Sequence, residues 1–435
     1  MIRILKLSQL SAAELSTLKK RAELDIENAL AVAQEVITQI KSRGDDGVVE
    51  YVRKFDNPEA SRENLKVTAK EFEQAEQEID PELKKAIELA YNNILEVHQR
   101  QMPEEMHFAE ISPGVFAGEK VTPIASAGLY VPRGKGAFPS VMLMLAVPTQ
   151  VTKVPHVIVC TPPDKQGKVE PASLVAARMA GVENVYKLGG IQAIASMAIG
   201  TETIPKVDKI TGPCNVYGSA AKRLLYGLVD VGLPAGPSES IILADETTDP
   251  RIAALDLLVE AEHGPESAAL LVTHSESLAK AASQHVMEYL ETLPAWRKEF
   301  CLKGLSSYGG IILTDSLEES LDFINQYAPE HLEVLVNDPI SVLGKIKNAG
   351  EILLGPYTPI PTANYCIGVN AILPTGGFAR SYSAVSVFDF LKRTGIGYLT
   401  KEGFDSLKGA TQLLAEYEGF PAHAMSIRER NNLLK

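Results

Sequence analysis

The sequence predicts an α/β protein made of two tandem Rossmann-like lobes, each with a parallel sheet, and of helical segments at both ends of the chain. Short β-branched runs alternate with Ala-rich helical patterns from about residue 120, and the same alternation begins again near residue 238. Such alternation favours right-handed βαβ units. The 435 residues exceed what one core usually accommodates, so several domains are expected.

Residues 1–119 are predicted to form a helical region that packs on the second lobe. Ser11 is suited to cap the helical pattern at residues 11–24, and residues 71–101 repeat apolar side chains at helical spacing.

The first lobe is predicted to span residues 120–236. The runs "HVIVCTPP", "NVYKLGG" and "DKITGP" indicate strands, and "PASLVAARMAG", "IQAIASMAIG" and "VYGSAAKRLLYG" indicate the helices between them. No G-x-G-x-x-G follows a strand. The small residues in "KLGGIQA" and "TGPCN" could turn backbone N–H groups toward a phosphate, and tight strand–helix packing explains them equally well.

The second lobe is predicted to span residues 237–380. Its strands are "SESIILAD", "AALLVTH", "GGIILTD", "LEVLVND" and "GEILLGP", with helices such as "PRIAALDLLVEAEH" and "PISVLGKIKNAG" between them. In two-lobed α/β proteins, ligands bind at the carboxyl ends of the strands. Residues 356–380 are loop-rich, and helical patterns from "AVSVFDFLKRT" onward predict a helical tail over residues 381–435.

Charge and cysteine usage exclude some classes of protein. The net charge of -13 argues against a nucleic-acid partner, which needs clustered Lys and Arg. The charge-free apolar stretch at residues 137–152 is too short to cross a membrane, and the first residues lack an apolar signal core. The four cysteines have no C-x-x-C spacing, which is typical of reduced thiols in a cytoplasmic protein.

Two acid–histidine pairs are candidates for chemistry. Glu260 and His263 lie one helical turn apart before Gly264, and they could form half of a divalent metal site; alternatively, His263 only complements the helix dipole. Glu330 and His331 stand where a helical pattern changes to a strand, so both could act in one cleft, the acid on a water and the imidazole on a hydroxyl proton.

The remaining histidines differ in what they suggest. The tail holds His423 after a helix-ending Gly and Pro, where an imidazole has little structural reason to stand. The others are expected to be structural or exposed: His98, His107, His156, His274 and His285.

An ordered series of motifs resembles the histidinol dehydrogenase family. The motifs are "GLYVP", "KLGGIQAIA", "DKITGPCN", "LPAGPSE", "AEHGP", "APEHLE", "NAILPTGG", "FDFLKRT" and "EGFPAH", which together cover about residues 30–430. The resemblance implies a zinc-dependent, intertwined homodimer that oxidises an amino alcohol through an aldehyde to a carboxylate with two NAD in turn.

The resemblance also implies roles for individual residues. Glu330 would activate water for the aldehyde stage, and His331, with a pKa near 6.5, would be the base toward the alcohol. The remaining roles, by position, are metal ligands Glu260, His263, Asn364 and His423 (His423 from the partner subunit), NAD contacts Tyr130, Gln192 and Asn215, and substrate contacts Ser238, Glu260, His263, His331, Asn364, Glu418 and His423.

Four positions depart from the family pattern. Glu260 replaces a metal-binding glutamine and Asn364 replaces a metal-binding aspartate, so the formal charge around the ion is unchanged and zinc is still expected to bind. Ala371 replaces a histidine that faces the substrate, which removes a hydrogen-bonding partner. Arg133, where a glycine is expected, adds a cation on the cofactor side.

Several functions remain open at this stage. The first is oxidation of L-histidinol to L-histidine, and the second is the same four-electron oxidation of another small polar alcohol, for example one with an anionic group that an arginine meets. A third is a thiol-dependent aldehyde dehydrogenase that uses Cys366, with Cys214 beside Asn215 as a further thiol. A non-enzymatic binding protein is disfavoured because Glu330 and His331 are present.

Overall fold

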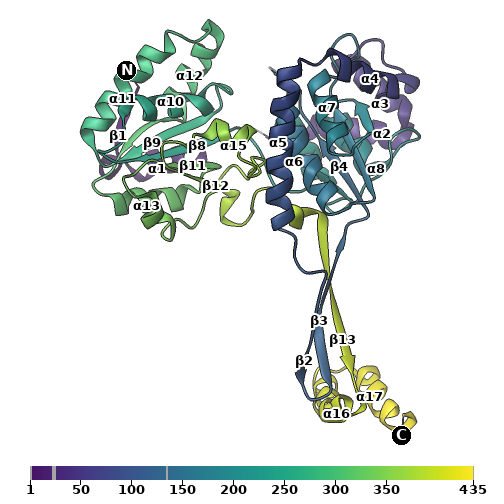
Figure 1. Ribbon diagram of the computed structural model, residues 1–435. Helices are drawn as coiled ribbons and strands as arrows, with labels where there is room; N and C mark the ends of the chain where they lie inside the picture. The colour runs from purple at the N-terminus through teal and green to yellow at the C-terminus, as the bar shows by residue number, and fades with distance from the viewer. Residues whose placement is uncertain (1, 22–25, 134–135, 435) are drawn as a thin grey trace. The chain divides into compact units, whose positions relative to one another are not determined.

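The computed structural model describes residues 2–21, 26–133 and 136–434. Its contacts divide the chain into two units (Figure 1). The core unit comprises Met1–Gln101 and Ala125–Phe390, and the tail unit comprises Met102–Ile124 and Leu391–Lys435. The expected α/β class with two parallel sheets is confirmed within the core unit. Among the described residues, no helix combines the length and apolarity needed to cross a membrane.

The second lobe contains a six-stranded parallel sheet in the order β1-β10-β9-β8-β11-β12. Alternate residues of a strand face opposite sides, so Ile241 and Leu243 join one hydrophobic cluster while Ile242 and Ala244 join another. The strands are β1 (Ile4–Lys6), β8 (Glu239–Ala244), β9 (Ala268–Thr273), β10 (Gly310–Leu313), β11 (His331–Val334) and β12 (Glu351–Leu354). The helices are α10 (Pro250–Ala261), α11 (Glu276–Leu290), α12 (Ala295–Ser307), α13 (Leu317–Tyr327), α14 (Pro339–Leu343) and α15 (Ile360–Tyr365).

The first lobe contains a four-stranded parallel sheet in the order β6-β5-β4-β7. The predicted strand and helix runs of this lobe are all present. The strands are β4 (Ser126–Tyr130), β5 (His156–Thr161), β6 (Val185–Lys187) and β7 (Lys209–Thr211), and the helices are α6 (Pro139–Val151), α7 (Pro171–Met179), α8 (Gly190–Ile199) and α9 (Val216–Leu225).

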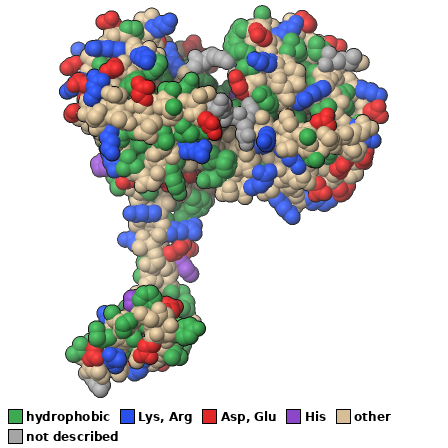
Figure 2. Space-filling view, turned by 180° about the vertical axis from the view of Figure 1, so that it is seen from behind, with side chains coloured by type: hydrophobic (Ala, Val, Ile, Leu, Met, Phe, Trp, Pro, Cys, Tyr) green, Lys and Arg blue, Asp and Glu red, His purple; other side chains and the backbone are tan. Residues whose placement is uncertain are grey.

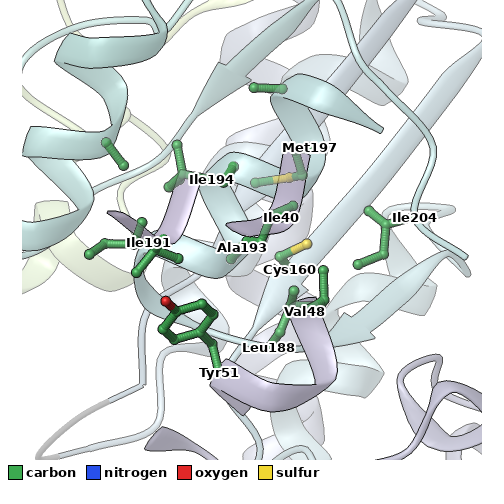
Figure 3. Close-up of a cluster of buried hydrophobic side chains, with 14 of the residues drawn as sticks. Ile40, Val48, Tyr51, Cys160, Leu188, Ile191, Ala193, Ile194, Met197 and Ile204 are labelled. Atoms are coloured by element: carbon green, nitrogen blue, oxygen red, sulfur yellow. The ribbon is translucent and has the colours of Figure 1, made fainter. Parts of the chain in front are cut away.

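The N-terminal region is divided between the lobes, which corrects the expectation that it packs on the second lobe. Strand β1 pairs with β10, and Leu15 and Leu18 of α1 pack in a second-lobe cluster. In contrast, α2 contacts α8 and α9, α4 contacts α7, and α5 contacts α6. Figure 3 shows Ile40 and Val48 of α2 and α3 among first-lobe side chains such as Ile194. The helices are α1 (Ala12–Lys20), α2 (Ile26–Arg43), α3 (Asp45–Phe55), α4 (Ala69–Glu78) and α5 (Pro81–Arg100).

Local capping explains where these N-terminal helices begin. Ser11 caps α1 with a capping box in which Glu14 reciprocates, as predicted. The single helical pattern over 71–101 becomes two helices because Pro81 starts a new one, capped by Asp80. The end of the predicted helix over 11–24 lies partly outside the described residues.

The tail unit contains a three-stranded antiparallel sheet and two helices (Figure 1). Residues from Leu391 were predicted to be helical, and this is wrong, because Leu391–Leu399 pairs along its whole length with β3. Gly395 and Gly397 weaken a helix there, and the aromatic and β-branched residues suit a strand. The elements are β2 (Met106–Ser112), β3 (Val115–Pro123), β13 (Leu391–Leu399), α16 (Lys401–Tyr417) and α17 (Pro421–Leu433).

Candidate active site

A sharp corner between α13 and β11 presents Glu330 and His331. Helix α13 ends at Ala328, which adopts φ +54° and turns the chain out of the helix. The strand then begins at His331, as the sequence predicts. The residue just before β12 fixes the corner, because the Gly350 amide donates to the Pro329 carbonyl. The backbones approach so closely that a Cβ on Gly350 would lie 2.5 Å from the Glu330 carbonyl oxygen.

The two side chains of the corner are fixed by specific partners. Glu330 Oε2 accepts a hydrogen bond of 2.8 Å from the Glu239 amide, and Glu330 Oε1 lies 3.8 Å from His331 Nε2. His331 Nδ1 lies 2.5 Å from Glu351 Oε1. Nδ1 is thus engaged by a carboxylate, and Nε2 is the ring nitrogen that faces Glu330.

Burial and neighbouring charge shift both titrations. Burial raises the pKa of Glu330 well above its ordinary value, and the charges of Glu260 and Glu239 add to the rise against the opposing charge of His331. For His331, burial lowers the pKa, but Glu330, Glu260 and Glu351 outweigh burial and raise the pKa to about 10. The expectation of a pKa near 6.5 is therefore corrected. The carboxylates around the ring therefore favour its imidazolium form.

The end of α10 presents Glu260 and His263 together. Asp249 caps this helix and accepts from the Arg251 amide, as its position predicts. The Glu260 side chain is 0% exposed and neither of its carboxylate oxygens has a hydrogen-bond partner. The His263 ring remains 45% exposed, and Ser238 Oγ lies 2.9 Å from its Nδ1.

This half-site fits a divalent cation. A buried carboxylate without a hydrogen bond is expensive, and a bound cation is one way to stabilise it. Glu260 Oε2 lies 3.3 Å from His263 Nδ1. Two ligands about 2.0–2.1 Å from a tetrahedral zinc ion stand roughly 3.3–3.4 Å apart. The alternative role of His263 is to complement the helix dipole. That role does not explain why the Glu260 carboxylate is buried without a hydrogen bond.

The half-site and the catalytic corner lie within electrostatic reach of each other. The charge of Glu260 contributes to the pKa shifts of both Glu330 and His331. Asn364 lies on α15, which packs on α10 through Val259, Ile360 and Ala363. In the described ranges, no three His, Cys, Asp or Glu side chains converge as a metal site, so an additional ligand has to come from an amide or from elsewhere.

Two predicted site residues belong to the tail unit. Glu418 forms the C-cap of α16, and His423 stands in the first turn of α17, where its ring centroid is 5.1 Å from that of Phe420. Their meeting with the residues of the core unit stays a prediction.

The three predicted cofactor-contacting residues stand at one edge of the first-lobe sheet. Tyr130 ends β4, Gln192 follows β6, and Asn215 follows β7, so all three lie at the carboxyl ends of parallel strands. Tyr130 Oη accepts from the Gly190 amide at 3.0 Å. Gln192 Nε2 donates to Asp56 at 2.9 Å. Asn215 caps α9 by accepting from two backbone amides.

The helix amino ends of this edge are already capped, which favours packing over a phosphate cradle. Asp56 accepts from the Gly189 amide, and Tyr130 takes the amide of Gly190. A Cβ on Gly189 would approach Pro162 Cγ to 2.4 Å, so close packing explains this glycine.

A cavity of about 970 Å³ opens between residues of the two lobes. Cys214, next to Asn215, and Glu239, next to Ser238, both line the cavity. Its charged lining is mostly cationic: Lys19, Lys20, Arg21, Lys222 and Arg223. Such a lining suits an anionic ligand.

Hydrogen bonds of Asn370 anchor the loop that carries Ala371. Asn370 donates to the Met144 carbonyl at 2.7 Å and stands 3.3 Å from Nε2 of His98. His98 is fully buried and its Nδ1 is bonded to the Ile94 carbonyl, so its structural role is confirmed. Ala371 therefore differs from the histidine of the family pattern in its side chain, while the loop backbone is held in place by Asn370.

The remaining candidate residues have simple surroundings. Arg133 donates to the Lys168 carbonyl at 3.1 Å and stands 3.9 Å from Asp164, next to residues outside the described ranges. Cys366 is the C-cap of α15, and its carbonyl accepts from Asn93. A catalytic role for this thiol stays an untested alternative.

Sequence reasoning missed Glu239 and Glu351, which touch the catalytic pair. Glu239 stands beside Ser238 in a recognised motif, which was a usable signal. Glu351 opens a strand twenty positions after His331, and only the strand register brings the two together.

Comparison with known proteins gives a consistent result. A family model described as histidinol dehydrogenase matches residues 19–431. A histidinol dehydrogenase of Synechocystis sp. is 67% identical over 434 residues, covering 100% of both chains. A histidinol dehydrogenase homolog of Colwellia psychrerythraea is 48% identical, covering 98% of this chain and 96% of the relative. The crystal structure of histidinol dehydrogenase from Elizabethkingia anophelis superposes with a TM-score of 0.93 at 35% identity, covering 99% of this chain and 98% of that one.

Proposed function

Because the chain belongs to the histidinol dehydrogenase family and is an oxidoreductase of that family, we propose that it oxidises L-histidinol to L-histidine in two NAD-linked steps. One observation carries the proposal: the buried, unbonded carboxylate of Glu260 stands beside His263 and within electrostatic reach of Glu330 and His331. This supports a polar binding site beside a proton-transferring pair.

His331 is proposed to act as the base toward the alcohol. Hydride leaves the carbinol carbon for nicotinamide only as the hydroxyl proton departs, and Nε2 is the free face of the ring because Nδ1 is engaged by Glu351. The ring first has to lose the proton that its carboxylate neighbours stabilise. Neutralising the charge of Glu260 lowers that requirement, since Glu260 contributes to the raised pKa.

Glu330 is proposed to serve the aldehyde stage. The carboxylate takes a proton from the water that attacks the aldehyde, which gives a hydrate whose carbon then releases the second hydride. One oxygen of Glu330 is held by the Glu239 amide, so the other is oriented toward the imidazole side of the site. Burial raises the pKa of this carboxyl, which strengthens its affinity for the proton taken from water.

Glu260 and His263 are proposed to hold zinc, together with Asn364 and with His423 of a second copy. The ion would fix the amine and imidazole of the substrate and thereby orient the alcohol. Ser238 and Glu418 are proposed to contact the substrate. Tyr130, Gln192 and Asn215 are proposed to contact NAD.

The exchange of tails in a cytoplasmic homodimer is part of the proposal. Within the described part of the tail unit, only Val115 and Ala424 are buried hydrophobic residues. So small a core does not stabilise a separate unit. Hydrophobic side chains stand exposed on its helices (Figure 2), among them Leu413, Tyr417 and Leu433. A second copy of the chain is the proposed cover.

The proposal is tested by incubating the zinc-loaded protein with L-histidinol and NAD. The expected result is two NADH for each histidine formed. Production of one NADH with accumulated aldehyde, or no NADH, contradicts it.

A second candidate is the same oxidation of another small polar alcohol. It is favoured by Ala371, which leaves the fixed loop without the imidazole of the family pattern. A screen of primary alcohols for NADH formation separates the two candidates. The variant Ala371→His should improve the use of histidinol over other alcohols if the pocket is the cause.

A further inference from the structure

A buried carboxylate on β12 engages the imidazole of the proposed base. Strand β12 runs parallel to β11 with His331 directly opposite Glu351, so the two side chains lie on the same face of the sheet. Glu351 Oε1 is 2.5 Å from His331 Nδ1. The side chains of His331 and Glu351 are only 5% and 7% exposed.

The backbone of the same residue holds the reactive corner. The Glu351 amide donates to the Glu330 carbonyl at 3.0 Å, next to the bond from Gly350 to Pro329. One residue therefore fixes both the ring of His331 and the main chain of its acidic neighbour.

The stability of the fold does not explain this carboxylate. Glu351 Oε2 is buried and has no hydrogen-bond partner, so the group has lost water and regained one strong bond. Replacing a buried ionic group by a neutral one of similar size is often neutral or stabilising. A carboxylate bonded to one nitrogen of a histidine fixes the tautomer and the ring orientation and stabilises the imidazolium that forms in catalysis.

We propose that Glu351 is the positioning residue of the reaction: it holds the proton on Nδ1 of His331 and so presents Nε2 to the substrate hydroxyl. This inference rests on the proposed function for its kinetic consequence. The tautomer itself is a property of the free protein.

The kinetic test compares Glu351→Ala and Glu351→Gln in the zinc-loaded enzyme. Glu351→Ala should lower kcat about 10- to 1000-fold and change the KM for the alcohol less than threefold, because orientation of the base is lost while substrate contacts remain. Glu351→Gln keeps an acceptor for Nδ1 and should recover part of kcat.

The pH profile gives a readout that a purely structural role does not move. The charged groups facing His331 are Glu330, Glu260, Glu239 and Glu351. Removing one negative charge lowers the pKa of the imidazolium, so the acid limb of kcat/KM should move to lower pH in both variants. The matched control is Glu333→Gln, a buried carboxylate two residues along β11, which should leave kcat within threefold.

A measurement on the free protein separates failure of this inference from failure of the proposed function. In protein labelled with ¹⁵N-histidine, the His331 signals are identified by their loss in His331→Asn. The wild type should keep Nδ1 protonated up to a higher pH than Glu351→Gln does. Identical titration of the ring in both proteins overturns the inference even if histidinol is not the substrate, and so does full activity of Glu351→Ala.

Discussion

The two lobes treat their buried polar groups in opposite ways. At the predicted cofactor edge of the first lobe, Tyr130 and Gln192 are bonded to a backbone amide and to Asp56. In the second lobe, Glu260 and Glu333 are fully buried; neither oxygen of Glu260 has a hydrogen-bond partner, and Glu333 lies against a second carboxyl, that of Asp256. The polar side chains at the cofactor edge of the first lobe are thus held in place by protein hydrogen bonds before any ligand binds. The second lobe stores negative charge that a cation, a proton or a substrate has to balance.

Replacing His331 by Asn in the second lobe is expected to have the largest effect on activity. Alcohol oxidation should fall about 10²- to 10⁴-fold, because the base at the centre of the charged lobe is lost while its shape is nearly kept. Steady-state NADH formation and zinc content measure the two effects. His285→Asn on α11, where the ring pairs with Glu288 and packs beside Tyr289, is the control and should behave as wild type. Persistent turnover in His331→Asn would mean that another group takes the proton.

Removing the exposed half of the metal pair should lower zinc affinity. Changes to groups that merely orient a ligand cost about 10- to 100-fold, so loss of a ligand in His263→Ala should cost at least that much. Competition with a chromophoric chelator measures the change. His274→Ala removes a comparable histidine, 3.4 Å from Glu246, and should leave affinity unchanged. Equal affinity in both variants would place the ion elsewhere.

The buried acids of the second lobe should make stability depend on pH. Burial, and then the charge of Asp256, raise the pKa of Glu333 to about 9. The folded protein therefore keeps a proton that the unfolded chain loses above about pH 4–5, and stability falls as pH rises from there toward 9.

The variant Glu333→Gln tests this pH dependence. At pH 8.5 it should gain on the order of 1–3 kcal/mol in unfolding free energy over wild type, and the gain should shrink toward pH 5. Urea denaturation at several pH values measures it. Asp256→Asn should give a similar gain, and the double variant should add little because the pair shares one proton. A gain that does not change with pH counts against buried charge as the cause.

The smallest effect is expected at the cofactor edge of the first lobe, where the polar side chains already have hydrogen-bond partners within the protein. Tyr130→Phe removes one hydrogen bond to the Gly190 amide, worth about 0.5–1.5 kcal/mol, so the KM for NAD should rise roughly two- to twelvefold with zinc affinity unchanged. Tyr226→Phe, at an exposed tyrosine, serves as the control. A loss of zinc in Tyr130→Phe would show that the lobes are not independent.

Local pattern predicted much of this structure. Caps such as Ser11 and Asp249, and the change from helix to strand at His331, depend on residues close in sequence. The contact between His331 and Glu351 could not be predicted in this way, because it depends on the register of two strands joined through α14. The strand at Leu391 was missed because its partner β3 lies far away in sequence.

The pKa of His331 was misjudged for a similar reason. An isolated imidazole suggests a neutral base, but this one faces the neighbouring Glu330 and carboxylates from α10, β8 and β12. Charge sums over neighbours in space, which the order of residues along the chain does not reveal.

The close approach at Gly350 limits how this protein can be varied. Any side chain there would meet the main chain of the acid it supports, 2.5 Å from a carbonyl oxygen. A library randomised at position 350 and selected for turnover should therefore return glycine alone. To reshape the pocket for new alcohols, the loop around Ala371 is the better target. This loop already lacks the histidine of the family pattern.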